Sequence, residues 1–177
     1  MNKFAMTAAT AALMLSLSAG ALAASGLGSV TTMSGAGAEA DKAGSVTVNT
    51  TMCELELDDA GKITAVGFDI AQNKVGFDAT GALTGELTGE HPTKKELGDG
   101  YGMKAASGIG KEWFEQAEAL EDWCVGKTVE EVVTMPTYDK GDGHHTQVPD
   151  DVDLKTGCTI DVGSFLNALQ KAADNAK

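Results

Sequence analysis

The sequence predicts an α+β fold in which helices pack on one side of an antiparallel sheet. Residues 45–70 alternate apolar and polar side chains around a turn at residues 58–62, which is typical of antiparallel strands. Residues 113–124 and 162–176 instead carry apolar side chains at helical spacing. Because the strands come first and the helices follow, we expect a sheet and a separate helical layer.

The first 23 residues read as a secretory signal peptide. Lys3 precedes an Ala/Leu/Met-rich run that ends at Leu22, with small residues at the cleavage positions. An uncleaved membrane anchor is the alternative, since a spanning helix needs roughly 20 apolar residues. We therefore expect an exported protein, extracellular or associated with the cell envelope, in which residues 24–177 form a single domain.

The charge of the chain restricts its partners. Its 26 carboxylates face 13 basic residues, all of them lysine, for a net charge of -13. Nucleic acids are bound by clustered Lys and Arg, so a nucleic-acid partner is not expected. A phosphate group would depend on backbone amides, lysines, hydroxyls or a covalent bond, because no arginine is present.

The strands are expected in the first half of the chain. A short strand at residues 25–33 precedes a Gly/Ala-rich loop at 34–44, so residues 24–44 are expected to be a flexible N-terminal segment. Strands at 45–57, with a bulge near Thr50, at 63–70 and at 74–78 would form a meander. Residues 80–91 read as an extended connection and residues 93–101 as a loop.

Three helices are expected in the second half. The first places Trp113, Ala117, Leu120 and Cys124 on one face and ends at Gly126. Thr128 and Glu131 form a capping box that opens a short helix through residue 133. The last helix spans residues 162–176, with Asp161 as its cap.

The histidines and cysteines favour no metal site. His144 and His145 lie in a loop at residues 138–151, near aspartates that could complete a metal site, but no pair at spacing i, i+4 presets the geometry. Cys53, Cys124 and Cys158 form no CxxC pair. We expect a solvated loop, with metal binding by the loop as the alternative. Cys53 and Cys124 are expected to be small buried residues, and the odd number of cysteines leaves at least one thiol unpaired.

The stretch at residues 153–159 is the candidate site. Thr156 and Thr159 flank Gly157 and Cys158 just before the last helix, and Asp153 leads the stretch. Glycine allows a tight turn that presents the second hydroxyl to an outside enzyme. Alternatively, both threonines simply hydrogen-bond the turn and cap the helix.

Several segments, in order, resemble the secreted bacterial FMN-binding domain family. A Tyr-Gly-Met-Lys run at residues 101–104 precedes a Trp-x-Glu-Gln-Ala helix at 113–117, and the chain ends in an Asp-x-x-Thr-Gly-x-Thr turn and a helix. The Asp-x-x-Gly-Lys-Ile turn at 58–63 is similar to the opening meander of the family. This family is related to the FMN-bearing subunits of sodium-pumping NADH:quinone reductases and to surface flavin lipoproteins.

The resemblance implies a covalent flavin. In the family, a flavin transferase links FMN through its phosphate to the last threonine of the turn, which is Thr159 here. Asp153, Thr156 and Gly157 match the motif, whereas Cys158 stands where alanine is usual. Free amides at the start of the last helix are expected to help hold the phosphate.

The expected function is electron transfer by an exported flavoprotein. Its partners would be the transferase during maturation and a membrane or extracellular redox protein afterwards. No catalytic acid, base or nucleophile is expected beside the flavin, so a redox carrier is favoured over a stand-alone enzyme. The alternative is a secreted non-redox binding or interaction module that retains the fold without flavin.

Overall fold

The computed structural model describes residues 24–85 and 87–177. The predicted signal peptide, residues 1–23, lies outside the described residues. The elements follow the order β1 (Ala24–Ala36), β2 (Gly44–Leu57), β3 (Ile63–Phe77), α1 (Lys94–Leu97), the 3₁₀ helix η1 (Gly98–Tyr101), α2 (Trp113–Cys124), α3 (Val129–Val133), β4 (Thr137–Tyr138), β5 (Val148–Pro149) and α4 (Gly163–Asp174).

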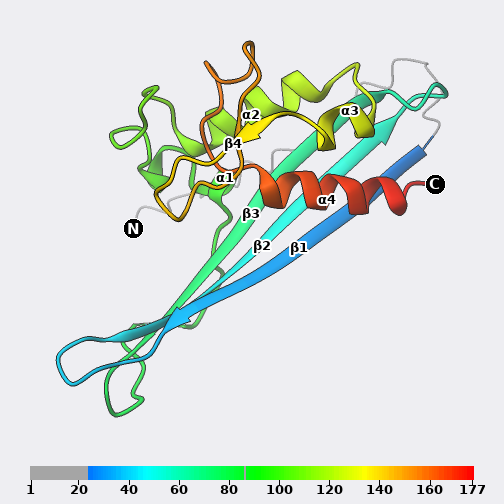
Figure 1. The fold of residues 1–177 in the computed structure, drawn as a ribbon. Coiled ribbons are helices and arrows are strands. Elements are labelled where there is room, and N and C mark those ends of the chain that lie inside the picture. The colour runs from blue at the N-terminus through cyan, green and yellow to red at the C-terminus, as the bar shows by residue number, and fades with distance from the viewer. Residues whose placement is uncertain (1–23, 86) are drawn as a thin grey trace, which may run out of the picture.

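The fold is the predicted α+β arrangement. Strands β1, β2 and β3 form an antiparallel meander in sequence order, and β4 and β5 form a separate two-stranded ladder. Figure 1 shows the helices gathered over one face at one end of the long sheet. The other end of the three strands projects beyond the helices as an arm that carries the β1–β2 loop and the turn that follows β3.

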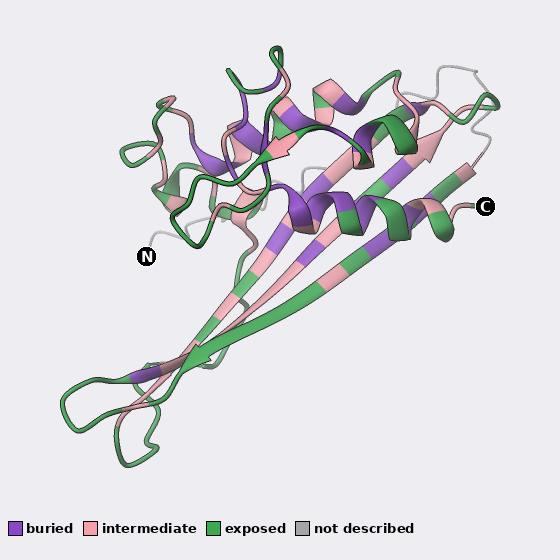
Figure 2. Ribbon diagram, viewed as in Figure 1, coloured by how far each residue is buried: buried purple, intermediate pink, exposed green. Residues whose placement is uncertain are grey.

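The core lies between the sheet and α2 and α4. Alternate residues of β2 and β3 point into it, among them Cys53, Leu55 and Phe68, and the ring of Phe68 packs 5.1 Å from that of Phe165 on α4. Trp113 of α2 lies 5.9 Å from the same Phe165 ring. Figure 2 shows that buried residues concentrate beneath the helices, whereas the arm is mostly exposed or half-buried.

Two glycines let α4 lie directly on β1. A Cβ on Gly26 would come within 2.0 Å of the carbonyl oxygen of Ala172, and one on Gly28 within 2.1 Å of that of Ala168. Real Cβ atoms do not approach backbone oxygens this closely, so glycine is required at both positions. The same helix and its C-cap residue also cover the free edge of β1. The ammonium of Lys171 donates to the carbonyl of Ser29 (2.9 Å), and the side-chain amide of Asn175 donates to the carbonyl of Leu27 (3.0 Å).

The strand predictions hold only in part. The short strand expected at residues 25–33 is present within β1, but β1 spans 24–36 and pairs with β2 along its whole length, so these residues are not part of a flexible segment. The pairing shows no shift at Thr50; the irregularity lies between Glu56 and Leu57. The two strands expected at 63–70 and 74–78 are one, β3.

These errors share a physical cause. On β2, burial in the core stops at Thr51, and residues 45–50 are half-buried or exposed. Where neither face of a strand contacts a core, apolar and polar side chains need not alternate. The sequence pattern then no longer shows which residues point to which face of the sheet. The apparent slip near Thr50 therefore marks the point where the sheet leaves the helical layer.

The predicted helices are confirmed, with one addition. The structure has α2, α3 with its Thr128–Glu131 capping box, and α4. Residues 93–101 were expected to be a loop but form α1 and η1. Thr93 and Glu96 make a second capping box there. This Thr-x-x-Glu pattern is visible in the sequence and indicates the start of the one-turn helix α1.

Candidate functional site

The turn at residues 153–159 connects β5 to α4 and is closed by its own backbone. The amides of Gly157 and Cys158 both donate to the carbonyl of Leu154, at 2.8 Å each. Leu154 is buried in the core, which anchors the turn from below. The turn is therefore a fixed part of the fold.

Asp151 organises the start of this turn. One of its carboxylate oxygens accepts from the amides of Asp153 (2.9 Å) and Leu154 (3.1 Å), and also from the indole of Trp123 on α2 (3.2 Å). Asp153, the predicted leading acid, is exposed, and its carbonyl accepts from the hydroxyl of Thr156 at 3.2 Å. The carboxylate that shapes the turn is thus two residues earlier than the motif indicated.

Gly157 lets the turn contact α2. A Cβ at this position would lie 2.9 Å from the Cβ of Ala119 and 3.8 Å from the ammonium nitrogen of Lys111. Any side chain here would push the turn away from the helix. The glycine was predicted from the backbone needs of a tight turn, but its φ is not positive, and the structure requires it for close packing instead.

Thr159 is held by a buried glutamine of α2. The side-chain oxygen of Gln116 accepts from the amide of Thr159 at 2.8 Å and lies 3.2 Å from its hydroxyl. The amide nitrogen of Gln116 donates to the hydroxyl of Ser107 (3.1 Å) and to the carbonyl of Lys111 (3.3 Å). Gln116 is completely buried, so these bonds set the position of Thr159, which itself stays half-buried.

This contact joins two separate sequence motifs. Gln116 belongs to the Trp-x-Glu-Gln-Ala helix, and Thr159 ends the Thr-Gly-x-Thr turn. Sequence reasoning did not identify Gln116 as a site residue. A signal existed, because this glutamine lies within the apolar stripe formed by Trp113, Ala117 and Leu120, where a polar side chain needs a partner.

The run at residues 101–104 is fixed to the same helix. The carboxylate of Glu112, which is 3% exposed, accepts from the amides of Lys104 (2.9 Å) and Met103 (2.8 Å). These bonds lower the pKa of Glu112 below its usual range, and the bond from the amide of Lys104 lowers it most. The Tyr-Gly-Met-Lys run is thereby placed beside the first turn of α2.

Cys158 points to the core. Its thiol is fully buried, and burial raises its pKa to about 11. Cys53 and Cys124 are buried too, with pKa values raised by burial to about 12. All three cysteines are free. A thiol in place of a methyl group therefore changes the interior of the turn, while Thr156 and the half-buried Thr159 stay accessible.

We expect the three thiols to resist alkylation in the native protein. Thiolate is the reactive form, and buried groups with pKa values of about 11 to 12 supply almost none near pH 8. Iodoacetamide at about pH 8 should label none of them before unfolding and all three after addition of denaturant, as read by intact mass. Rapid native labelling of Cys158 would show that its side chain is accessible in the turn.

Two lysines lie beside the turn. The ammonium of Lys140 donates to the carbonyl of Thr159 at 2.7 Å. Lys111 lies beside Gly157, and both cations act electrostatically on the thiol of Cys158. Sequence reasoning singled out neither lysine. In a chain without arginine, they add to the exposed Lys155 of the turn itself as positive charges that an anion could meet here.

The expected role of the α4 amides is wrong in part. The carboxylate of Asp161, the predicted cap, accepts from the amide of Gly163 at 3.0 Å, and the amide of Val162 donates to the carbonyl of Gln147 at 2.9 Å. These two amides are therefore not free for a phosphate. A negative charge already occupies the start of the helix, which moves any phosphate toward the lysines.

A cavity of about 530 Å³ is lined by residues that follow Thr159, although Thr159 itself is not among the lining residues. Ile160, Asp161 and Gly163 line one side of it. Tyr101 and Trp113 line another, with the ammonium of Lys94 at 4.8 Å and 5.2 Å from their ring centres. The remaining lining residues come from the three long strands, from the segment after η1, from the histidine loop and from α4. They are Val30, Thr32, Asn49, Ile70, Met103, His144, His145, Thr146, Gln147, Ser164 and Asn167.

Among the side chains of residues 24–85 and 87–177, no group of three or more His, Cys, Asp or Glu is arranged to hold a metal ion. No helix within the same residues has the length and apolar character needed to cross a membrane.

Comparison with known proteins finds one stretch of similarity. Over 96 residues, 48% of this chain, the sequence is 38% identical to a chlorophenol reductase from Desulfitobacterium hafniense. The match spans 29% of that protein. No protein-family model and no solved structure matches the chain.

Proposed function

We propose that this protein is an exported electron carrier whose FMN is attached through its phosphate to Thr159. The observation that carries the proposal is the bond between Gln116 and Thr159. It fixes one hydroxyl on a closed turn, where Lys140 bonds the carbonyl of Thr159 and the next residue, Ile160, lines a cavity shared with Tyr101 and Trp113. The similarity to part of a reductase supports a redox role.

The residues around Thr159 fit such a group. The hydroxyl oxygen of Thr159 would become the bridging atom of the phosphoester, and the ammonium groups of Lys111 and Lys140 would offset the phosphate charge. The cavity lined by Tyr101, Trp113 and Met103 offers apolar and aromatic contacts to a flat ring system. When bound, the flavin supplies the redox chemistry, and the protein supplies attachment, orientation and exclusion of water.

The exposed side chains of the turn are where a partner protein would contact it. Asp153, Lys155 and Thr156 are exposed, so a flavin transferase could read these side chains while the buried ones keep the turn rigid. After export by residues 1–23, a membrane or extracellular redox protein would exchange electrons with the flavin. The acidic surface would favour a partner with a basic contact region.

The test is whether the substitution Thr159→Ala removes the covalently attached flavin. We expect the wild-type protein, co-expressed with a transferase and run denatured, to show flavin fluorescence and an FMN mass increment. Thr159→Ala should lose both completely, because no other oxygen is held in this position, and Thr159→Ser, which keeps the hydroxyl, should regain label. Covalent flavin on Thr159→Ala would contradict the proposal.

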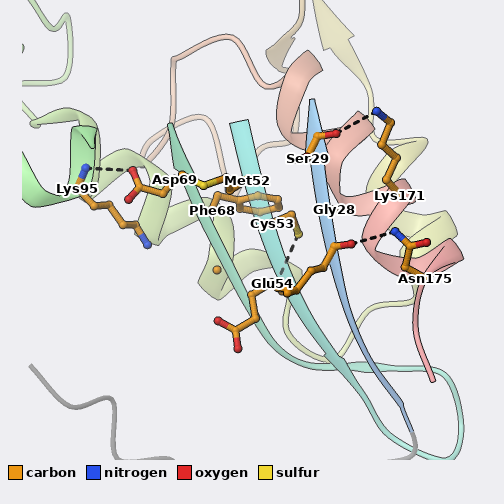
Figure 3. A pocket seen from close by; sticks show the side chains of 12 residues that line it. Gly28, Ser29, Met52, Cys53, Glu54, Phe68, Asp69, Lys95, Lys171 and Asn175 are labelled. Atoms are coloured by element: carbon orange, nitrogen blue, oxygen red, sulfur yellow. Dashed lines mark hydrogen bonds between the residues drawn. The ribbon is translucent and has the colours of Figure 1, made fainter. Parts of the chain in front are cut away.

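A second function is favoured by a separate cavity. It has a volume of about 600 Å³ and lies on the sheet between Lys95 of α1 and Lys171 of α4, as Figure 3 shows. Leu27, which is 71% exposed, Met52 and Gly67 also line it. A non-redox binding module would use this cavity. A colourless protein that binds a small apolar ligand, and loses it in Gly67→Leu, would support that alternative.

A further inference from the structure

The loop that carries His144 and His145 is fastened to the turn that carries Thr159. Lys140 begins the loop, and while its ammonium binds the carbonyl of Thr159, its amide donates to the carbonyl of His145 at 2.9 Å. At the other end of the loop, the carboxylate of Asp161 accepts from the amides of Thr146 and Gln147, at 2.9 Å each. The loop is thus held over the start of α4.

Both histidines line the cavity of about 530 Å³ that Ile160, Tyr101 and Trp113 also line. They differ in their contacts. The Nδ1 atom of His145 lies 2.7 Å from a carboxylate oxygen of Asp142, whereas the structure gives the ring of His144 no such partner. His145 therefore has an oriented imidazole at a cavity wall.

Asp142 is built to stay ionised. Its other carboxylate oxygen accepts from the amides of His144 (2.9 Å) and His145 (2.8 Å). These bonds, followed by the one from the His145 ring, lower the pKa of Asp142 well below its usual value. An ionised carboxylate can only accept, so Nδ1 carries hydrogen and Nε2 is the nitrogen left for proton exchange.

We propose that His145, oriented by Asp142, delivers the proton that accompanies reduction of the flavin held at Thr159. This inference rests on the proposed function. A reduced redox protein would supply two electrons to the flavin and His145 would supply one proton, so that the N–H bond at Nε2 would break and the proton would pass to the reduced flavin. The neutral imidazole then regains a proton from solvent, to which 39% of the side chain is exposed.

Other titratable groups face the same cavity and must be considered. They are Lys94 of α1, Tyr101 of η1, Asp161 before α4, and His144 beside His145. The ammonium of Lys94 lies over the rings of Tyr101 and Trp113, and Asp161 is bonded to backbone amides. Imidazole is the side-chain group whose ordinary change of charge falls between about pH 5 and pH 8.

The experiment uses the flavin-loaded full protein and follows its reduction by dithionite in stopped flow from about pH 5 to pH 8. We expect the wild-type rate to fall as pH rises, because the protonated imidazole is the donor. His145→Gln should slow reduction at low pH by about tenfold to a hundredfold and flatten the profile. Asp142→Asn should lower the rate less, and His91→Gln, whose side chain does not line the cavity, should match the wild type.

The solvent isotope effect on this rate gives a second readout. It should be present in the wild type and lost in His145→Gln, while both proteins unfold at the same temperature. A loaded His145→Gln protein that keeps the wild-type pH profile and isotope effect overturns the proton-delivery role alone. Absence of covalent flavin from all variants, wild type included, overturns both this role and the function on which it rests.

Discussion

Gly28→Ala is expected to destabilise the protein by about 2–4 kcal/mol, a fall in melting temperature of roughly 5–15 °C. The added methyl carbon would lie 2.1 Å from the carbonyl oxygen of Ala168 and 2.5 Å from the amide nitrogen of Ala172. Both neighbours are backbone atoms of α4, so relief requires the helix to move away from β1. Such a movement would also open the contacts of Phe165 with Phe68 and Trp113.

Gly67→Ala is the matched control for this variant. Gly67 lies in β3, and a Cβ built on it meets no atom within 4 Å. The same substitution there should change the free energy of unfolding by less than about 1 kcal/mol, in either direction. Urea denaturation of both variants makes the comparison. Equal stabilities would show that α4 does not depend on a glycine contact with β1.

Gln116→Leu is expected to destabilise the fold by about 2–5 kcal/mol and to abolish flavin loading. Leucine has a similar volume but leaves the amide of Thr159 without its acceptor, and the carbonyl of Lys111 loses a donor. A buried polar group without a partner costs about 1–3 kcal/mol. Because Gln116 also positions the hydroxyl of Thr159, the transferase would meet a displaced acceptor.

Gln170→Leu is the control for this prediction. Gln170 is an exposed residue of α4 that bonds to Asp174 at 3.0 Å, so the same substitution there should change stability by no more than about 0.5 kcal/mol. Melting temperature and denatured flavin fluorescence should be measured on both proteins. A Gln116→Leu protein that folds and loads as well as Gln170→Leu would show that Thr159 does not depend on α2.

The helices were predictable because their signals are local. The stripe of α2 and the capping box of α3 each lie within a dozen residues, and burial matches the periodicity. The extent of the strands was not predictable in the same way. β1 exists because it pairs with β2 and receives α4 through Gly26 and Gly28, and these contacts join residues far apart in the sequence.

The candidate site shows the same division. The placement of Gly157 and Thr159 in a turn before the last helix follows from neighbouring residues. The partner of Thr159 does not, since Gln116 lies 43 residues earlier. The role of Asp161 was half predicted: the N-cap of α4 is Val162, but Asp161 accepts from the amide of Gly163, and it also holds the histidine loop, a contact that only the tertiary structure reveals.

Peptide mapping of the flavin-loaded protein tests the central claim most directly. Trypsin cleaves after Lys155 and Lys171 and so releases a single peptide of residues 156–171 that contains both Thr156 and Thr159. We predict that fragmentation of this peptide places the FMN phosphate on Thr159. An unmodified peptide from protein co-expressed with an active transferase, or FMN located on Thr156, would contradict it.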